Sequence, residues 1–313
     1  MKGILINSYG GPEVLEYSEI PKVVAGQGEI VIKTKFAAVN PADWKVRKGK
    51  LKFITGKKFP KVLGIEASGI VEEVGEGVKS FTPGQHVFAS KDYTTGCYAE
   101  YFKISEKNAI LLPETMAFED AASIAVTGTT AYQSLVKHGG IEEGMRVLIN
   151  GASGGVGIMA VQIAKILGAT VTGVCSRKNV DFVKSLGADR VIDYSKTNFL
   201  EEKHQYDIII DSAGGLSFKN TKKSLAKRGT LIKLNISIGI LIDQIIKSSF
   251  SSKTVKLVIM KVIKEDFQWV RDQIAMGKLK VIIDKIFDLK DCKEAHEYSE
   301  TLRARGKILL KIN

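Results

Sequence analysis

The sequence predicts an α/β protein in which a mainly-β domain is interrupted by an inserted domain built on a doubly wound parallel sheet. Alternating apolar and polar residues mark short strands in the first third of the chain and again at its end. Between these regions, apolar strands alternate with amphipathic helices, the pattern of crossovers in a parallel sheet. We therefore place the mainly-β domain at residues 1–122 and 277–313, and the inserted domain at residues 123–276.

Strands of the mainly-β domain are indicated by their period of two. Ile30–Phe36 alternates throughout, and Gly69 interrupts the apolar segment Gly64–Val74, which predicts a bend or bulge there. We expect further strands at residues 86–89, 98–103, 281–287 and 307–312, and helices at residues 267–276 and 291–302.

The inserted domain shows a regular succession of strands and helices. The run Ile208–Ile210 is apolar throughout, which fits a strand of a sheet that is covered on both faces. We expect strands at residues 146–150, 170–175, 190–193, 207–211 and 229–234, and helices at residues 155–167 and 180–186.

A glycine-rich turn, Gly151–Gly157 with the sequence GASGGVG, joins the first of these strands directly to an amphipathic helix. This is the context in which such a turn binds a dinucleotide, because the amides at the helix start can hold a pyrophosphate. Gly151 permits the tight turn, Gly154 leaves room for the pyrophosphate, and Gly157 allows close packing of the helix on the sheet. The expected cofactor-binding residues of the turn are Ala152, Ser153, Gly154, Gly155 and Val156. The alternative is a turn that only connects strand and helix.

The end of the second strand indicates which dinucleotide is bound. NAD enzymes usually place an acidic residue here, about 20 residues after the glycines. In this chain Cys175 is followed by Ser176, Arg177 and Lys178, and this segment has no aspartate that would repel a phosphate. A hydroxyl group and two cations suit the 2′-phosphate of NADPH, so we expect Ser176 and Arg177 to bind it. The alternative is that the two cations are simply exposed at a helix start.

Further motifs occur in order along the chain. They are Val39–Asp43 (VNPAD), Gly64–Gly69 (GIEASG), Gly96–Tyr101 (GCYAEY), Val126–Tyr132 (VTGTTAY), Leu186–Asp189 (LGAD) and Asp211–Gly215 (DSAGG). With them, nearly the whole chain resembles the medium-chain dehydrogenase/reductase superfamily, and in particular its zinc-free quinone oxidoreductase branch. The resemblance implies a GroES-like first domain, an inserted Rossmann domain, a cleft between them, hydride transfer from a nicotinamide and a homodimer.

The resemblance also implies roles for individual residues. The nicotinamide would lie near Asn40 and Thr127, and the candidate catalytic residues are Asn40, Asp43, Trp44 and Thr127. Asp43 could instead shape a turn, and Trp44 could belong to the core. Further cofactor contacts are implied for Asn150, Tyr194, Asn235 and Arg305, although Arg305 also fits a solvated helix end. The sequence does not single out a proton donor, because Lys50 follows Gly49 where related enoyl-thioester reductases carry a tyrosine.

Metal ligands of the zinc-dependent relatives are absent from the corresponding positions. Those enzymes carry a cysteine at the position of Asn40 and a histidine at the position of Ile65. Glu66 alone cannot supply the three protein donors of a catalytic zinc site. We therefore expect no metal.

Composition and charge argue against several other classes of protein. The net charge of +12 comes from lysines spread along the chain without a nucleic-acid-binding motif, so we expect no nucleic-acid partner. Leu234–Ile246 is the most apolar segment, but it contains Asp243 and is shorter than the ~20 residues of a membrane span, so we expect no membrane partner. Three scattered cysteines and a start unlike a signal peptide favour a cytoplasmic protein.

These observations predict a zinc-independent, NADPH-dependent oxidoreductase of the quinone oxidoreductase or enone reductase type. Its substrate would be a small quinone or an activated α,β-unsaturated carbonyl compound. The alternative, from another functional class, is an NADPH-binding redox sensor or a nucleic-acid-binding protein with little turnover.

Overall fold

The computed structural model describes residues 1–234 and 252–312, and the chain divides into two compact units. The first unit comprises Met1–Val126, Val262–Gly277 and Val281–Asn313, and the second comprises Thr127–Lys261 and Lys278–Lys280. No helix within the described ranges is long and apolar enough to cross a membrane.

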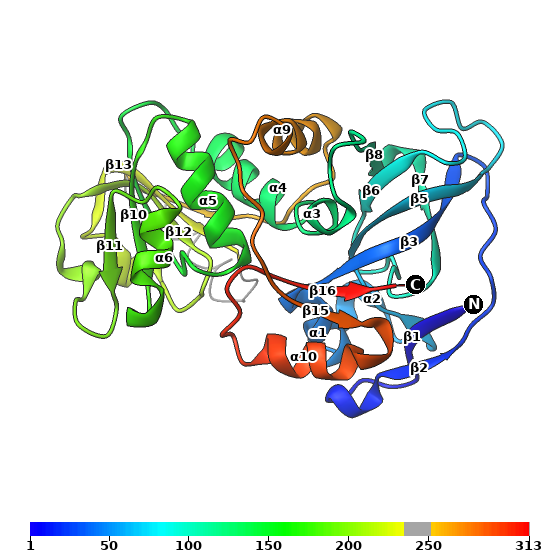
Figure 1. Ribbon diagram of the computed structural model, residues 1–313. Coiled ribbons are helices and arrows are strands. Elements are labelled where there is room, and N and C mark those ends of the chain that lie inside the picture. Colours follow the sequence, from blue (N-terminus) through cyan, green and yellow to red (C-terminus); the bar gives the residue numbers. More distant parts are fainter. Residues whose placement is uncertain (235–251, 313) are drawn as a thin grey trace. The chain divides into compact units, whose positions relative to one another are not determined.

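The first unit is built on a seven-stranded sheet and a small antiparallel sheet (Figure 1). The large sheet has the order β15 (Ile283–Asp288), β16 (Lys307–Lys311), β3 (Glu29–Val39), β5 (Glu66–Val74), β6 (His86–Ser90) and β8 (Ala109–Leu111), and β7 (Tyr101–Ser105) also pairs with β3. The small sheet has the order β2 (Glu16–Glu19), β1 (Lys2–Ile6) and β4 (Lys61–Val62). The antiparallel pairing of β16 with β3 shows that the end of the chain returns to the first sheet.

The predicted irregularity at Gly69 is confirmed. The register between β3 and β5 shifts next to the pair Thr34–Gly69, and a Cβ atom on Gly69 would collide with the carbonyl oxygen of Lys33. The backbones of the two strands therefore approach more closely here than a side chain would allow.

The first unit also contains helices. They are α1 (Pro41–Arg47), α2 (Lys52–Thr55), α3 (Phe118–Ala122), α9 (Lys264–Ala275) and α10 (Cys292–Glu300), with single turns at Pro12–Val14, Glu106–Asn108 and Leu289–Asp291. Of these helices, α3, α9 and α10 pack against strands of the large sheet. The structure assigns α9 to the first unit, whereas the sequence analysis placed it in the inserted domain. Its Phe267 ring lies 5.6 Å from that of Phe88, centroid to centroid, and Arg271 Nη1 donates to the Leu111 carbonyl at 3.2 Å.

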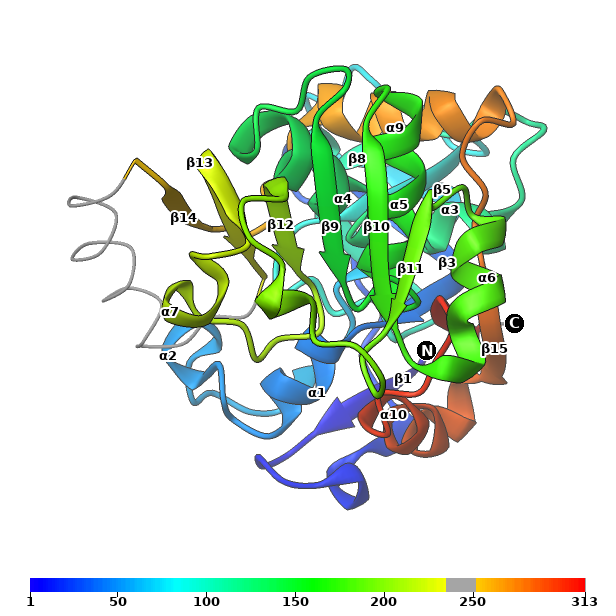
Figure 2. The same cartoon turned by 90° about the vertical axis from the view of Figure 1, so that its left-hand side faces the viewer.

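The second unit is a parallel six-stranded sheet (Figure 2). Its order is β11 (Arg190–Asp193), β10 (Thr170–Cys175), β9 (Arg146–Asn150), β12 (Tyr206–Asp211), β13 (Leu225–Lys233) and β14 (Thr254–Leu257). Numbered from β9, this is the order 3-2-1-4-5-6 of a doubly wound dinucleotide-binding sheet. The predicted bounds of β9, β10 and β11 are confirmed residue for residue.

The second unit also contains helices. They are α4 (Thr127–Tyr132), which continues into a π-helical segment (Gln133–His138), α5 (Gly155–Ile166), α6 (Val180–Ser185) and α7 (Phe218–Thr221), with single turns at Arg177–Asn179 and Phe199–Glu201. Of these helices, α5, α6 and α7 connect its strands. Because all sheet pairings are parallel, the carboxyl ends of the strands lie along one edge. Four segments follow strands at this edge: the glycine-rich turn, Ser176, and the residues after β11 and β12.

Candidate functional site

The carboxyl edge of the second unit's sheet carries most of the cofactor-binding residues expected from the sequence. β9 is paired on one side with β10 and on the other with β12, and the strand order reverses at this point. Ligands of open α/β sheets bind outside the carboxyl ends of the strands at such a reversal. The turn after β9 therefore occupies the position where a dinucleotide is expected.

Backbone packing fixes the shape of this turn. Gly151 has φ +84°, a left-handed conformation that favours glycine, and a Cβ atom there would lie 2.8 Å from Ser212 Oγ. A Cβ atom on Gly157 would collide with the Gly151 carbonyl oxygen, so α5 can begin this close to β9 only with glycine at that position. Among the described residues, the atom nearest to a Cβ on Gly154 would be Gly151 O, at the ordinary contact distance of 3.5 Å.

The first turn of α5 offers free backbone donors. The helix starts after Gly154, whose extended backbone has no side-chain cap, and its first hydrogen bond is Ile158 N–H to Gly154 O at 2.9 Å. The N–H groups of Gly155, Val156 and Gly157 precede that bond and have no acceptor within the helix. A helix of 12 residues adds the positive end of its dipole. Ala152 and Ser153 complete the turn, which can hold a pyrophosphate on amides alone.

Asn150 and Asp211 brace the turn from the two central strands. Asn150 Nδ2 donates to Asp211 Oδ1 at 2.8 Å, and Asp211 also accepts from the N–H groups of Gly214 (2.9 Å) and Leu216 (3.0 Å). Ser212 Oγ donates to Asn150 O at 2.7 Å. Asp211 was not among the predicted site residues, although its position at the acidic end of an apolar strand was visible in the sequence.

Residues expected at the adenosine end lie on neighbouring strands. Ser176 and the exposed Arg177 follow β10, and Tyr194 follows β11 with its side chain 64% exposed. The Tyr194 N–H donates to Cys175 O at 3.2 Å, which joins the two strand ends. Asn179 Nδ2 donates to Ser153 Oγ at 2.9 Å and links this region to the glycine-rich turn. The structure therefore brings Ser176, Arg177 and Tyr194 together.

Asp193 is a residue of this edge that the sequence analysis missed. It is paired in register with Cys175, so β11 places a carboxylate beside the strand end where the sequence analysis found no aspartate. The segment that follows β10 itself contains no acidic residue before Asp181. The signal that could have revealed Asp193 is the parallel sheet itself, since the end of the next strand must lie alongside.

The predicted residue Asn40 belongs to a buried polar cluster in the first unit. Lys307 Nζ lies 2.7 Å from both Asn40 Oδ1 and Glu66 Oε1, and Asn40 Nδ2 donates to Glu66 Oε1 at 3.0 Å. Glu66 Oε2 accepts the Val126 N–H at 2.6 Å. The charges of Glu66 and Lys307 are thus paired and hydrogen-bonded, as burial requires. Glu66 and Lys307 were not predicted as site residues, because both lie far from Asn40 in the sequence.

Asp43 is the predicted catalytic residue with the most perturbed acidity. It is the third residue of α1 and accepts the Asn40 N–H at 2.7 Å. Burial raises its pKa to about 7, and the negative charge of Glu66 acts in the same direction. Hydrogen bonds from the Asn40 N–H and the Tyr98 hydroxyl, and the charge of Lys307, oppose the shift. A pKa of about 7 suits a group that holds or releases a proton near neutral pH.

The remaining predicted residues lie in different parts of the chain. Trp44 is half-buried, and the Nζ atoms of Lys45 and Lys48 lie 5.7 and 5.3 Å from its ring centroid. Thr127 begins α4 in the second unit and is buried. Arg305 is exposed in the first unit. The pKa of the nearby Tyr298 is raised, mainly by its hydrogen bond to Asp284, and the charge of Arg305 opposes this rise. Asn235 lies outside the described residues.

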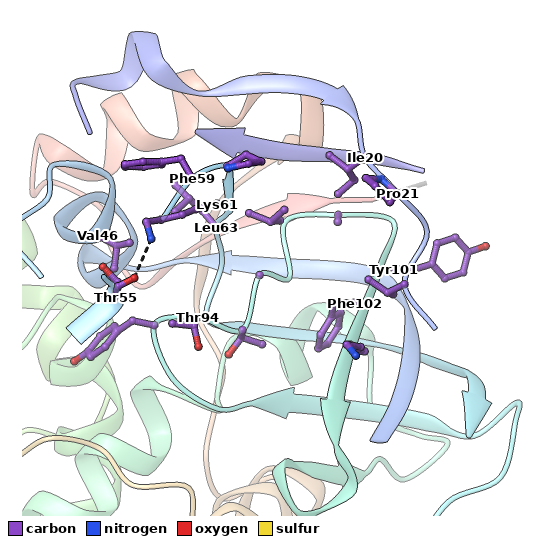
Figure 3. Close-up of a pocket in the computed structure, with 18 of the residues that line it drawn as sticks. Ile20, Pro21, Val46, Thr55, Phe59, Lys61, Leu63, Thr94, Tyr101 and Phe102 are labelled. Carbon is purple, nitrogen blue, oxygen red and sulfur yellow. Dashed lines mark hydrogen bonds between the residues drawn. The ribbon is translucent and has the colours of Figure 1, made fainter. Parts of the chain in front are cut away.

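The first unit also contains a pocket of about 480 Å³ (Figure 3). Val46, Phe59, Leu63 and Phe102 give it an apolar wall, and Lys61 Nζ at its side donates to the Thr55 carbonyl at 2.9 Å. None of the predicted catalytic residues lines it, although Val46 follows Asp43 by three positions in α1.

No cluster of three or more histidine, cysteine or acidic residues that could hold a metal ion occurs in residues 1–234 and 252–312. The three cysteines are buried and carry free thiols. Burial raises the pKa of the Cys175 thiol to about 11, and the carboxylate of Asp193 adds to this effect.

Comparisons with known proteins agree with this architecture. The family model described as "Alcohol dehydrogenase GroES-like domain" matches residues 26–114, and that described as "Zinc-binding dehydrogenase" matches residues 186–310. The chloroplast envelope quinone oxidoreductase homolog of Arabidopsis thaliana is 32% identical, over 99% of this chain and 98% of the relative. A trans-enoyl reductase of Aspergillus terreus is 31% identical, over 92% of this chain and 87% of the relative. The structure of Escherichia coli quinone oxidoreductase complexed with NADPH is 28% identical, with a TM-score of 0.87 over 100% of both chains.

Asp43→Asn tests whether the buried carboxyl group takes up a proton on folding. Because the pKa of Asp43 in the folded protein is about 7, above its ordinary value of 3.8, the folded protein retains a proton that the unfolded chain releases. The stability of the wild type therefore falls as pH rises through this window, and that of Asp43→Asn does not. Between pH 5 and 8, the free energy of unfolding of the wild type should fall by about 2–3 kcal/mol relative to the variant. Urea denaturation at both pH values measures this difference, and parallel pH profiles would contradict the expectation.

Gly157→Ala and Gly154→Ala separate packing from cofactor binding. The new Cβ at residue 157 collides with backbone, so we expect a loss of about 2–3 kcal/mol in the free energy of unfolding. At residue 154 the Cβ has space, and the loss should stay below about 1 kcal/mol. Gly154→Ala should nevertheless weaken binding of a dinucleotide, because the methyl group occupies the face that a pyrophosphate would approach. Denaturation and calorimetric titration measure the two effects, and equal destabilisation by both variants would refute the packing argument.

Proposed function

This chain belongs to the medium-chain dehydrogenase/reductase superfamily, in its quinone oxidoreductase-like branch, and we propose that it transfers hydride from NADPH to a quinone or an activated α,β-unsaturated carbonyl compound. The observation that carries this proposal is the free amide edge at the start of α5, held against the end of β9 by Gly157. The similar Escherichia coli enzyme is complexed with NADPH, and the similar Aspergillus enzyme is a trans-enoyl reductase.

Each part of the second unit's edge would hold one part of the cofactor. The amides of Gly155 and Val156 would bind the pyrophosphate, and Asn150 would line the approach to it. Arg177 and Ser176 would bind the 2′-phosphate through charge-assisted hydrogen bonds, with Tyr194 beside the adenosine ribose. The nicotinamide, when bound, would supply the hydride.

In the first unit, Asp43 is the group best suited to hold a proton, because its pKa of about 7 leaves both protonation states populated near neutral pH. Asn40 and Trp44 remain the other candidate catalytic residues there, and Thr127 remains the candidate in the second unit. We propose that the reaction proceeds without zinc, since Asn40 and Ile65 offer neither the thiolate nor the imidazole that zinc ligation would need. The substrate oxygen must then be polarised by hydrogen bonds. The proposal includes a cytoplasmic homodimer whose only other partner is its small-molecule substrate.

Steady-state assays test the proposed activity. We expect the purified protein to oxidise NADPH in the presence of at least one member of a panel of simple quinones and enones, with no added metal and in the presence of a chelator. Loss of absorbance at the reduced nicotinamide band measures the rate. No oxidation with any member of the panel would contradict the proposed function, and activity that chelation abolishes would contradict the zinc-free part alone.

Arg177→Ala tests the assignment of the 2′-phosphate. One charged hydrogen bond contributes roughly 1.5–3 kcal/mol, so the variant should bind NADPH at least about tenfold more weakly. Binding of NADH, which lacks the phosphate, should change little. Calorimetric titration with both cofactors gives the comparison, and Lys178→Ala serves as a neighbouring charge control. Equal losses for NADPH and NADH in Arg177→Ala would refute the role.

A further inference from the structure

We propose that Asp193 is a specificity-determining residue of the cofactor site, which weakens the preference for NADPH and allows NADH to bind as well. This inference rests on the proposed nicotinamide cofactor. It concerns the adenosine end of the site, where Arg177 alone would favour the phosphorylated cofactor.

Strand pairing places the Asp193 carboxylate next to the proposed 2′-phosphate site. Asp193 lies opposite Cys175 in the parallel pairing of β11 with β10, and neighbouring strands are about 4.8 Å apart. Ser176 and Arg177 follow Cys175 directly. The negative charge of Asp193 affects residues before and after Ser176. It adds to the rise in the pKa of the Cys175 thiol, and it interacts with the Arg177 guanidinium.

The two carboxylate oxygens of Asp193 have different surroundings. Oδ1 accepts hydrogen bonds from the Ser195 N–H at 3.0 Å and from Ser195 Oγ at 2.7 Å. Oδ2 is shielded from solvent and has no hydrogen-bond partner within the part of the chain that the structure describes, and the residue as a whole is 8% exposed. The Ser195 hydrogen bonds hold the carboxylate at the end of β11, so Asp193 acts on the cofactor site through its charge rather than through a contact of Oδ2.

The charge of Asp193 distinguishes the two cofactors. NADH carries a neutral 2′-hydroxyl group, whereas NADPH carries a phosphate at the same position, which a nearby carboxylate repels. Hydrogen bonds from Ser195, and the charges of Lys196 and Arg177, lower the pKa of Asp193, so its carboxylate is ionised at neutral pH. Asp193 and Arg177 therefore act in opposite directions on the same position of the adenosine ribose.

Asp193→Asn removes the charge and leaves the local structure in place, because an amide oxygen can still accept both hydrogen bonds from Ser195. Asp189→Asn is the matched control. It removes the same charge at the other end of the same strand, where Asp189 pairs with Lys165 at 2.9 Å. Four residues of extended chain separate the two sites by roughly 13 Å, beyond the Debye length of about 8–10 Å.

Calorimetric titrations with NADPH, NADH, adenosine 2′,5′-bisphosphate and 5′-AMP test the proposal. The two adenosine probes report on this end of the site without the nicotinamide. In Asp193→Asn we expect the ratio of NADPH to NADH affinities to rise about three- to tenfold, and the ratio for the adenosine probes to rise in parallel. In Asp189→Asn both ratios should stay at the wild-type value.

The possible outcomes separate this inference from the proposed function. If neither NADPH nor NADH binds the wild type, the proposed function fails. If both bind but Asp193→Asn leaves the ratios unchanged, or Asp189→Asn shifts them equally, the role of Asp193 is overturned. Should Asp193→Asn not fold, the wild type alone decides. A preference for NADPH below about 100-fold, the upper range of one charged hydrogen bond, supports the inference, and a larger preference overturns it.

Discussion

The contact between Gly157 and the carbonyl group of Gly151 is the constraint on which the candidate site depends. No side chain fits between them, so the first turn of α5 lies directly against the end of β9. This position leaves the first amides of the helix without an acceptor inside the helix, at the carboxyl edge of the sheet and beside the reversal of strand order. A phosphate-binding edge therefore arises from backbone geometry, and the side chains around it decide which nucleotide it accepts.

At the adenosine end, charged side chains would decide which nucleotide the backbone edge accepts. Arg177 comes from the segment after β10, and Asp193 comes from the end of β11. Only the register of the two strands brings them to the same place. The first unit shows the same principle in its interior, where the ion pair of Glu66 and Lys307 joins β5 to the last strand of the chain and engages the Asn40 side chain.

Much of the fold follows from local patterns in the sequence. β9, β10 and β11 begin and end where apolar runs and turn residues predict, because each buried strand must be apolar and each connection must turn. The small sheet of β1, β2 and β4 was not predicted, since β2 is largely exposed and β4 has only two residues. The membership of α9 in the first unit depends on Phe267 meeting Phe88, a contact between distant segments that no local pattern encodes.

The candidate site was predictable to a similar extent. The glycine-rich turn carries its own signal, because Gly151 and Gly157 are each required by a local backbone contact. Asp193, Asp211 and Lys307 were missed as site residues because their roles come from strand pairing rather than from neighbours in the sequence. The unusual acidity of Asp43 likewise depends on burial, which depends on the packing of the whole first unit.

Backbone amide NMR during a titration with NADPH shows directly whether the amino terminus of α5 binds the pyrophosphate. We expect the resonances of Gly155 and Val156 to shift among the most strongly, since their N–H groups would donate to the pyrophosphate. We also expect smaller shifts at Ser176 and Arg177 when NADH replaces NADPH. Resonances of the α5 amino terminus that stay in place at saturating cofactor would contradict the account.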